Sequence, residues 1–189
     1  MIRFLTALIF ILGFQSFTKA DDISEFQING ISVGDSALIF LEKDWIESQT
    51  KNWYEKKFFE ITYSSDDPNY ENISLTFKPK DKNYIIYQVN GTITFKNINE
   101  CLLKKKNIIK EMSEMFLNAK KIDAGKRNYS YDPTGESKTY TIYYYMKSGG
   151  FIEIACYDLT EKLATEKNWL QTSLNIGVVK KELANFLSK

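Results

Sequence analysis

Two cysteines and a lack of histidine limit the chemistry that this sequence can support. Cys101 and Cys156 are its only cysteines, and none of the 189 residues is histidine. Histidine is the usual side chain for proton transfer near neutral pH and the commonest ligand of transition metals. Two cysteines alone provide too few ligands for a zinc site. The sequence therefore predicts neither a metal site nor a cofactor.

The same two cysteines are expected to point into one core. Cys101 lies on the apolar stripe of a predicted helix, and alternation along a predicted strand places Cys156 on the same face as Ile152 and Ile154. Two cysteines in an exported protein usually form a disulfide. Closing a loop of about 56 residues stabilises a fold by roughly 4 kcal/mol in the chain-entropy account. Two buried free thiols are the alternative.

A serine and several carboxylates are the remaining candidates for catalysis. The segment Gly34-Asp35-Ser36-Ala37-Leu38 resembles the Gly-Asp-Ser block of a lipase and esterase family, in which the serine is the nucleophile. That family takes its base from a histidine, so here capping of a helix is the expected role of Asp35 and Ser36. The acidic loops 64–72 and 132–138 lack the ligand pattern of a calcium loop. Paired carboxylates for hydrolysis stay open, because no pair stands out.

One predicted strand carries a tyrosine pattern that is typical of binding surfaces. Between Thr139 and Met146, alternation places Tyr143 and Tyr145 on one face, and Tyr157 of the next strand shares that face. Tyrosine offers apolar area and a polar tip, so this face is a candidate surface for a glycan, a peptide or a protein. The alternative is that tyrosine simply covers the wet side of a sheet.

The elements that would position these residues predict an α+β fold. We expect three strands in the first half of the chain. The second half should contain a hairpin, a further strand that ends at the break at Gly177, and a short closing helix. Asn97 and Glu100 form a capping box at the start of the long helix. We expect an antiparallel sheet, a meander plus a hairpin, with the long helix and short terminal helices on one face. The expected bounds are 57–63, 73–77, 84–95, 98–119 (helix), 139–146, 151–157, 169–176 and 178–187 (helix).

The first 20 residues have the layout of a secretory signal peptide. A short basic start precedes eleven apolar residues from Phe4 to Phe14, and Thr18 and Ala20 are the small residues that the peptidase requires before Asp21. A membrane-spanning helix needs about 20 apolar residues, so no stable span is expected after cleavage. The sequence predicts a signal peptide over 1–20, cleaved between Ala20 and Asp21, and a single domain over 21–189 in the periplasm or outside the cell. An uncleaved anchor is the alternative.

The charge of the mature chain argues against nucleic acid as a partner. Arg3 and Lys19 lie in the signal, so 23 of the 25 Lys and Arg residues remain against 24 Asp and Glu residues, a net charge of −1. Nucleic-acid-binding proteins need a basic surplus to neutralise phosphates. Arg127 is the only arginine of the mature chain. The lysines at 104, 106 and 110 are expected on a solvated helix face.

Three blocks carry a resemblance to known proteins: FQINGISVGDSALIFL, INECLLKK and SGGFIEIACYD. Together they resemble small exported proteins of marine alphaproteobacteria of the Pelagibacter type, a likeness that implies no activity. The Gly-Ile-Ser turn before short helices and a meander is similar to periplasmic domains of the β-lactamase-inhibitor-like kind, which implies a binding module. We therefore expect a non-catalytic binding or interaction domain, with a carboxylate-dependent extracytoplasmic hydrolase as the alternative. The sequence specifies neither the ligand nor an oligomeric state.

Overall fold

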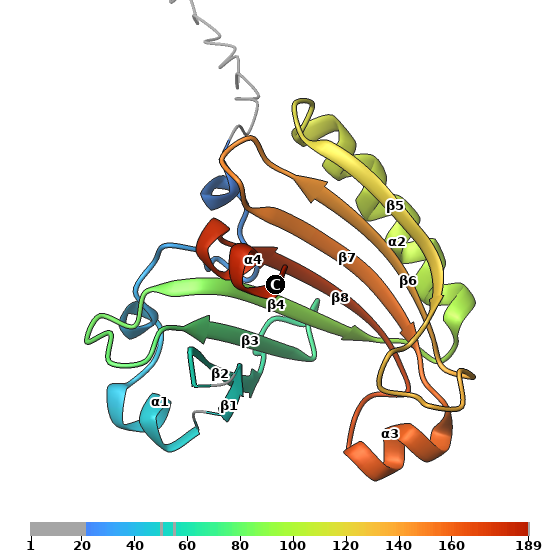
Figure 1. Ribbon diagram of the computed structural model, residues 1–189, viewed down its shortest axis with the longest axis horizontal. Helices are drawn as coiled ribbons and strands as arrows, with labels where there is room; N and C mark the ends of the chain where they lie inside the picture. Colours follow the sequence, from blue (N-terminus) through green and yellow to red (C-terminus); the bar gives the residue numbers. More distant parts are fainter. Residues whose placement is uncertain (1–21, 50, 55, 189) are drawn as a thin grey trace, which may run out of the picture.

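A computed structural model describes residues 22–49, 51–54 and 56–188 of this protein (Figure 1). The predicted signal peptide and its cleavage site between Ala20 and Asp21 lie outside the described residues. The described chain is built on one antiparallel sheet of eight strands in the order β1-β2-β3-β4-β8-β7-β6-β5. The predicted α+β class with a helix packed on an antiparallel sheet is confirmed.

Two four-stranded meanders make up the sheet, and α2 connects them. The second meander folds back so that its last strand, β8, pairs with β4, the last strand of the first. The strands are β1 (Lys51–Tyr54), β2 (Phe58–Ser64), β3 (Asn72–Phe77), β4 (Ile86–Thr94), β5 (Lys120–Asn128), β6 (Lys138–Tyr145), β7 (Phe151–Asp158) and β8 (Thr172–Val179). The helices are η1 (Ile23–Glu25), η2 (Ala37–Ile39), α1 (Lys43–Gln49), α2 (Ile98–Met115), α3 (Glu161–Lys167) and α4 (Lys181–Leu187).

The prediction for the last strand, 169–176, is wrong at both its start and its end. β8 begins at Thr172, and Trp169 belongs to the turn that follows α3, where Asn168 adopts the left-handed conformation that ends the helix. Gly177 does not break the strand, because it pairs with Asn90 on one side and Glu153 on the other. Its lack of a side chain leaves room for Asn90 Oδ1, which lies 3.4 Å from the position that a Cβ would take.

The long helix α2 begins where the capping box predicts. The Asn97 side chain accepts a hydrogen bond from the Glu100 backbone N–H at 3.1 Å and donates one to the Glu100 carboxylate at 2.9 Å. The helix ends at Met115, four residues before the predicted end at Ala119. Phe116 leaves the helical conformation but stays buried against Phe26, so the apolar pattern continues past the helix.

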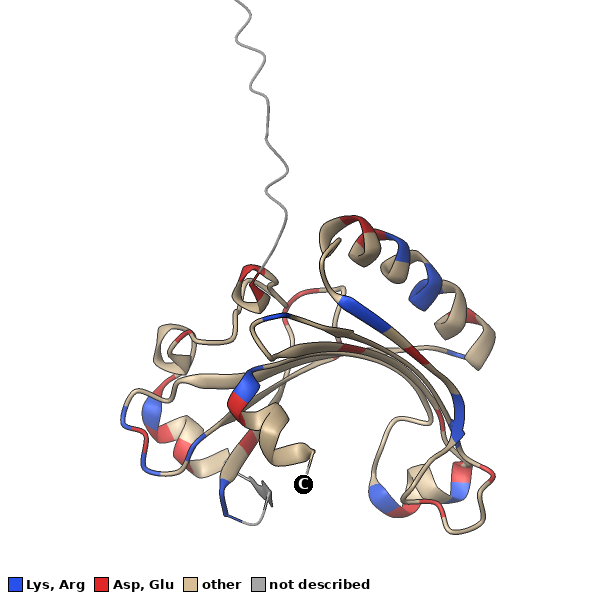
Figure 2. Ribbon diagram, turned by 45° about the horizontal axis from the view of Figure 1, so that its top comes forward, with Lys and Arg blue, Asp and Glu red and all other residues tan. Residues whose placement is uncertain are grey.

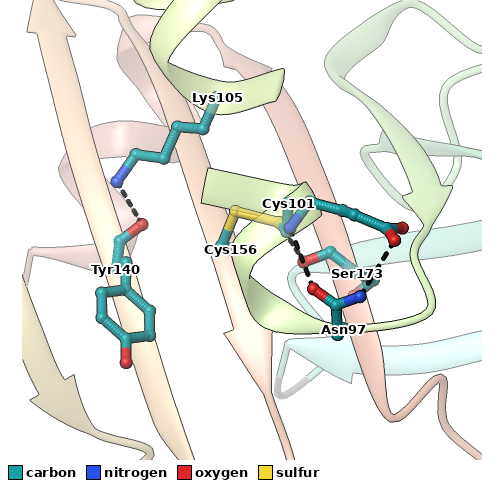
Figure 3. The surroundings of a disulfide bond; sticks show 7 residues. Asn97, Cys101, Lys105, Tyr140, Cys156 and Ser173 are labelled. Carbon is teal, nitrogen blue, oxygen red and sulfur yellow. Dashed lines mark hydrogen bonds between the residues drawn. A yellow bond between two sulfur atoms is a disulfide. The ribbon is translucent and has the colours of Figure 1, made fainter. Parts of the chain in front are cut away.

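One face of the sheet, the apolar face, holds the main core beneath α2. Alternate residues of the central strands point to it, among them Ile154 of β7 and Ile176 of β8. The Sγ atoms of Cys101 and Cys156 lie 2.00 Å apart, so the expected disulfide joins α2 to β7 (Figure 3). One turn further along α2, the buried Lys105 donates a hydrogen bond to the Tyr140 carbonyl at 2.5 Å. The apolar face is therefore fastened to α2 by covalent and polar links as well as by packing.

The opposite, polar face of the sheet lies inside the arch that Figure 2 shows, where α3 and α4 are found. Leu183 of α4 packs there against Val179 and Phe58, in a small apolar cluster that is separate from the main core. The closing helix therefore differs from the prediction in position, since it lies opposite α2. It also begins at Lys181, because Val178 and Val179 are the last residues of β8.

Candidate functional site

Polar side chains from six neighbouring strands lie on the inner face of the arch. The strand register aligns them in rows that run across the sheet. One row crosses β2, β3, β4, β8, β7 and β6 at Thr62, Ser74, Asn90, Gly177, Glu153 and Tyr143. The next row crosses the same strands at Ser64, Asn72, Thr92, Asn175, Ala155 and Thr141. Because the apolar residues between them point to the other face, this face has a polar, hydrogen-bonding floor.

A groove of about 370 Å³ lies on this floor, within the range of ligand sites in proteins. One wall of the groove is aromatic and is lined by Tyr157 of β7, Tyr129 after β5 and Trp169 after α3. The Tyr129 ring lies 5.7 Å from Tyr157 and 6.1 Å from Trp169, both edge-to-face. The full lining, which we call the polar groove, is Glu60, Thr62, Asn72, Ser74, Asn90, Thr92, Tyr129, Tyr157, Leu159, Asn168, Trp169, Leu170, Ser173 and Asn175.

Three buried polar atoms on the polar face have no hydrogen-bond partner among the described residues. They are Thr76 Oγ1, Gln88 Oε1 and Asn175 Oδ1, and Asn175 lines the polar groove itself. In the same floor, the Thr62 and Ser74 hydroxyls form a hydrogen bond at 2.9 Å. An unpartnered buried acceptor costs about 1–3 kcal/mol. The Asn175 side chain therefore lines the polar groove while its Oδ1 atom is buried without a partner among the residues that the structure describes, which is a cost to the fold at this position.

The electrostatics of the polar face are governed by two carboxylates. Glu60 is the one charged residue of the groove lining, which contains no lysine or arginine. Glu153 lies deeper in the sheet, where burial raises the pKa of its carboxyl and a hydrogen bond from Tyr143 opposes that rise. Burial and the neighbouring Glu153 charge raise the pKa of Tyr143 to about 12. Among the described residues, the lining of the polar groove therefore offers no cationic side chain to an anionic ligand.

The tyrosines that the sequence singled out lie at two ends of the polar face. Tyr143 and the more exposed Tyr145 pack with Phe151, with ring centroids 5.6–5.8 Å apart. Tyr157 instead belongs to the aromatic wall of the groove, since it pairs with Thr139, four residues from Tyr143 along β6. That separation is about 13 Å at the usual rise of a strand. Of the three tyrosines, only Tyr157 lines the polar groove.

Several residues of the groove were not singled out from the sequence. Trp169 falls in the predicted strand 169–176, and Tyr129 falls in no predicted element. The polar floor itself has a sequence signal, because Asn72, Ser74 and Thr76 alternate with buried apolar residues. Such alternation predicts only a wet face. The aromatic wall depends on the return of α3 over the end of the sheet, which no local pattern encodes.

The other residues tested for chemistry have structural roles. The Ser36 hydroxyl accepts a hydrogen bond from the Leu38 backbone N–H at 3.3 Å and donates one to the Asn83 carbonyl at 2.5 Å. Ser36 is therefore the N-cap of η2, as expected. Asp132 accepts hydrogen bonds from Ser137 and Thr134, which hold the pKa of its carboxyl well below the usual range. These bonds shape its loop.

Two further hollows lie away from the polar face. One, of about 450 Å³, is bordered by Lys43, Lys78, Lys80 and Lys82. The other, of about 510 Å³, lies between the N-terminal segment, Tyr70 and α2. Neither contains an unpartnered buried polar side-chain atom within the part of the chain that the structure describes. The polar groove is therefore the stronger candidate for a ligand site.

The described residues include no cluster of three acidic or cysteine side chains that could hold a metal ion. Within the same residues, no helix combines the length and apolar character that a membrane crossing requires. Comparison with known protein families, with curated proteins and with solved structures finds no match. The resemblances expected from the sequence stay predictions, and function is argued from the geometry of the site.

Proposed function

We propose that this protein is a non-catalytic binding domain that acts outside the cytoplasm, in the periplasm or after secretion, and holds its ligand in the polar groove. The observation that carries this proposal is a groove with a polar floor and an aromatic wall, lined by Asn175, whose buried Oδ1 atom has no partner among the described residues. A fold selected for stability alone would fill such a position with an apolar or fully bonded side chain. Departures of this kind concentrate at functional sites.

The carboxylates of the polar face support binding rather than hydrolysis. Glu60 shares a row with Phe151 of β7, so it lies four strand spacings from the strand that carries Glu153. Four spacings amount to about 19 Å. The paired carboxylates of glycoside hydrolases lie about 5 to 9.5 Å apart. We therefore favour the binding domain over the carboxylate-dependent hydrolase.

Replacement of one groove side chain tests the proposal. Asn175→Leu keeps the approximate volume but removes the hydrogen-bonding group, so it should abolish ligand retention. It should also leave stability unchanged or slightly higher, because an unpartnered buried acceptor is lost. Asn107→Leu makes the same replacement on an exposed position of α2 and is the control. Native mass spectrometry of each mature protein, after incubation with periplasmic extract and desalting, measures the retained ligand.

We expect a bound species on the wild-type and Asn107→Leu proteins and none on Asn175→Leu. Equal retention by all three proteins would contradict the proposal, as would an absence of any bound species on the wild type. Thermal unfolding of the same samples separates loss of the site from loss of the fold. A destabilised Asn175→Leu protein would mean that Asn175 serves the fold.

A further inference from the structure

The composition of the polar groove indicates an uncharged ligand. Four asparagines, two threonines and two serines line it, and Glu60 is its single charged residue. Anionic ligands such as phosphates, uronates or nucleic acids need cationic partners, which this lining does not contain. An acyl chain or a lipid would need an apolar floor. The lining, dominated by neutral Asn, Ser and Thr side chains, fits a neutral ligand that is rich in hydrogen-bonding groups.

The arrangement of donors and acceptors favours hydroxyl groups over peptide groups. Extended peptides usually bind a free sheet edge, where unpaired backbone groups are available. The floor of the polar groove is the interior of the sheet, since β3, β4 and β8 are each paired on both sides. Recognition must therefore come from side chains. Asn, Ser and Thr side chains, eight of which line the groove, offer both donors and acceptors, as the hydroxyl groups of a ligand do.

The aromatic wall adds a surface that suits the face of a sugar ring. Trp169, Tyr129 and Tyr157 form a cluster of rings in edge-to-face contact at one end of the floor, and Tyr131, 68% exposed, extends it outward. A pyranose ring has hydroxyl groups around its edge and C–H groups on its faces, which pack well on large aromatic rings. The floor spans β2 to β7, about 19 Å at the usual strand spacing. That width accommodates several linked sugar units.

We propose that the polar groove binds a neutral oligosaccharide, with a sugar ring on Trp169 and hydroxyl groups hydrogen-bonded to the Asn, Ser and Thr side chains of the floor around Asn175. This inference rests on the proposed function and adds the chemical class of the ligand.

Calorimetric titration of the mature protein tests it, with cellohexaose, xylohexaose and laminarihexaose as neutral probes and hexagalacturonate as the anionic control. We expect at least one neutral probe to bind, with an affinity that changes less than twofold when salt is raised to about 0.5 M, because no ion pair is screened.

Two groove variants and one control variant locate the binding. Trp169→Ala and Asn175→Leu should each lower the affinity for the neutral probe at least tenfold. Trp45→Ala should not change the affinity, since Trp45 of α1 packs on Tyr63 at the apolar face, away from the groove. Thermal unfolding checks that each variant is folded. If Trp169→Ala is not folded, Asn175→Leu alone is the groove variant of the test.

The inference is overturned if no neutral probe binds, if hexagalacturonate binds more tightly, or if Asn175→Leu binds as well as the wild type. The retention experiment then separates the two proposals. A retained ligand that Asn175→Leu loses leaves the proposed function standing without the sugar assignment. No retained ligand at all removes both.

Discussion

Glu153 shows how a single residue of the polar face affects stability. Burial raises the pKa of its carboxyl above the ordinary value of 4.5, so the folded protein holds this proton more tightly than the unfolded chain does. Stability is therefore lost as pH rises through 4.5 towards the raised pKa. Glu153→Gln removes this cost. We expect its melting temperature to exceed that of the wild type at neutral pH.

The pH dependence distinguishes this effect from better packing. The advantage of Glu153→Gln should shrink at about pH 3.5, where the carboxyl is protonated in both states. Exposed Glu161→Gln is the matched control and should behave like the wild type at both pH values. An advantage that is equally large in acid would show that burial of the charge is not its cause.

At this scale, sequence patterns identify faces but not what covers them. The alternation from Thr139 to Met146 assigns Tyr143 and Tyr145 to one side of β6, and the structure places both there. The same alternation cannot separate Tyr143 from Tyr157, because the arch and the return of α3 give each a different aromatic neighbourhood. The place of Trp169 in the aromatic wall cannot be predicted from alternation either, because only the tertiary fold brings it beside Tyr129.

At the scale of elements, the disulfide is the strongest single link between the helix layer and the sheet. Cys156→Ala should lower the free energy of unfolding by about 2–5 kcal/mol, because the unfolded chain regains the freedom of a loop of 55 residues. Urea unfolding of the oxidised wild type and of the variant measures the difference. Cys101→Ala should lose the same amount, since either change opens the same loop. Modification of both thiols by a blocking reagent in the denatured, unreduced protein would show that the bond is absent.

Elements with a strong local pattern were predicted, and elements that depend on a neighbour were not. The capping box located the start of α2, and Lys147 to Gly150 located the hairpin of β6 and β7. β5 is rich in lysine and exposed along nearly its whole length, so it lacks an apolar alternation and exists because β6 supplies its backbone partners. Gly177 is a further case, since its place in β8 depends on long-range pairing with β4.

At the scale of the whole molecule, the account requires export. The predicted signal peptide implies a mature N-terminus at Asp21, directly before Asp22, whose side chain caps η1. Intact-mass analysis of the protein recovered from the periplasm of a bacterial host measures this end. Ala20→Arg, which places a large charged residue at the cleavage site, should block processing. A membrane-bound product that still carries Met1 in the unchanged protein would contradict the prediction.

The arch of the sheet gives this small domain an inward-facing polar surface. α2 and the disulfide stabilise the outside of the arch, while α3 and α4 lie inside it and leave the polar groove open. This division explains how the chain can tolerate unpartnered polar atoms on one face. The main core on the other face supplies the stability.

The central claim is that the ligand lies in the polar groove, and side-chain amide NMR tests it most directly. The wild-type mature protein, labelled with ¹⁵N, is titrated with the ligand fraction that it retains from periplasmic extract. The account predicts that the side-chain amide signals of Asn90 and Asn175 and the indole signal of Trp169 shift together, while that of Asn107 on α2 stays fixed. Shifts confined to α2, or to the Tyr143, Tyr145 and Phe151 end of the sheet, would contradict it.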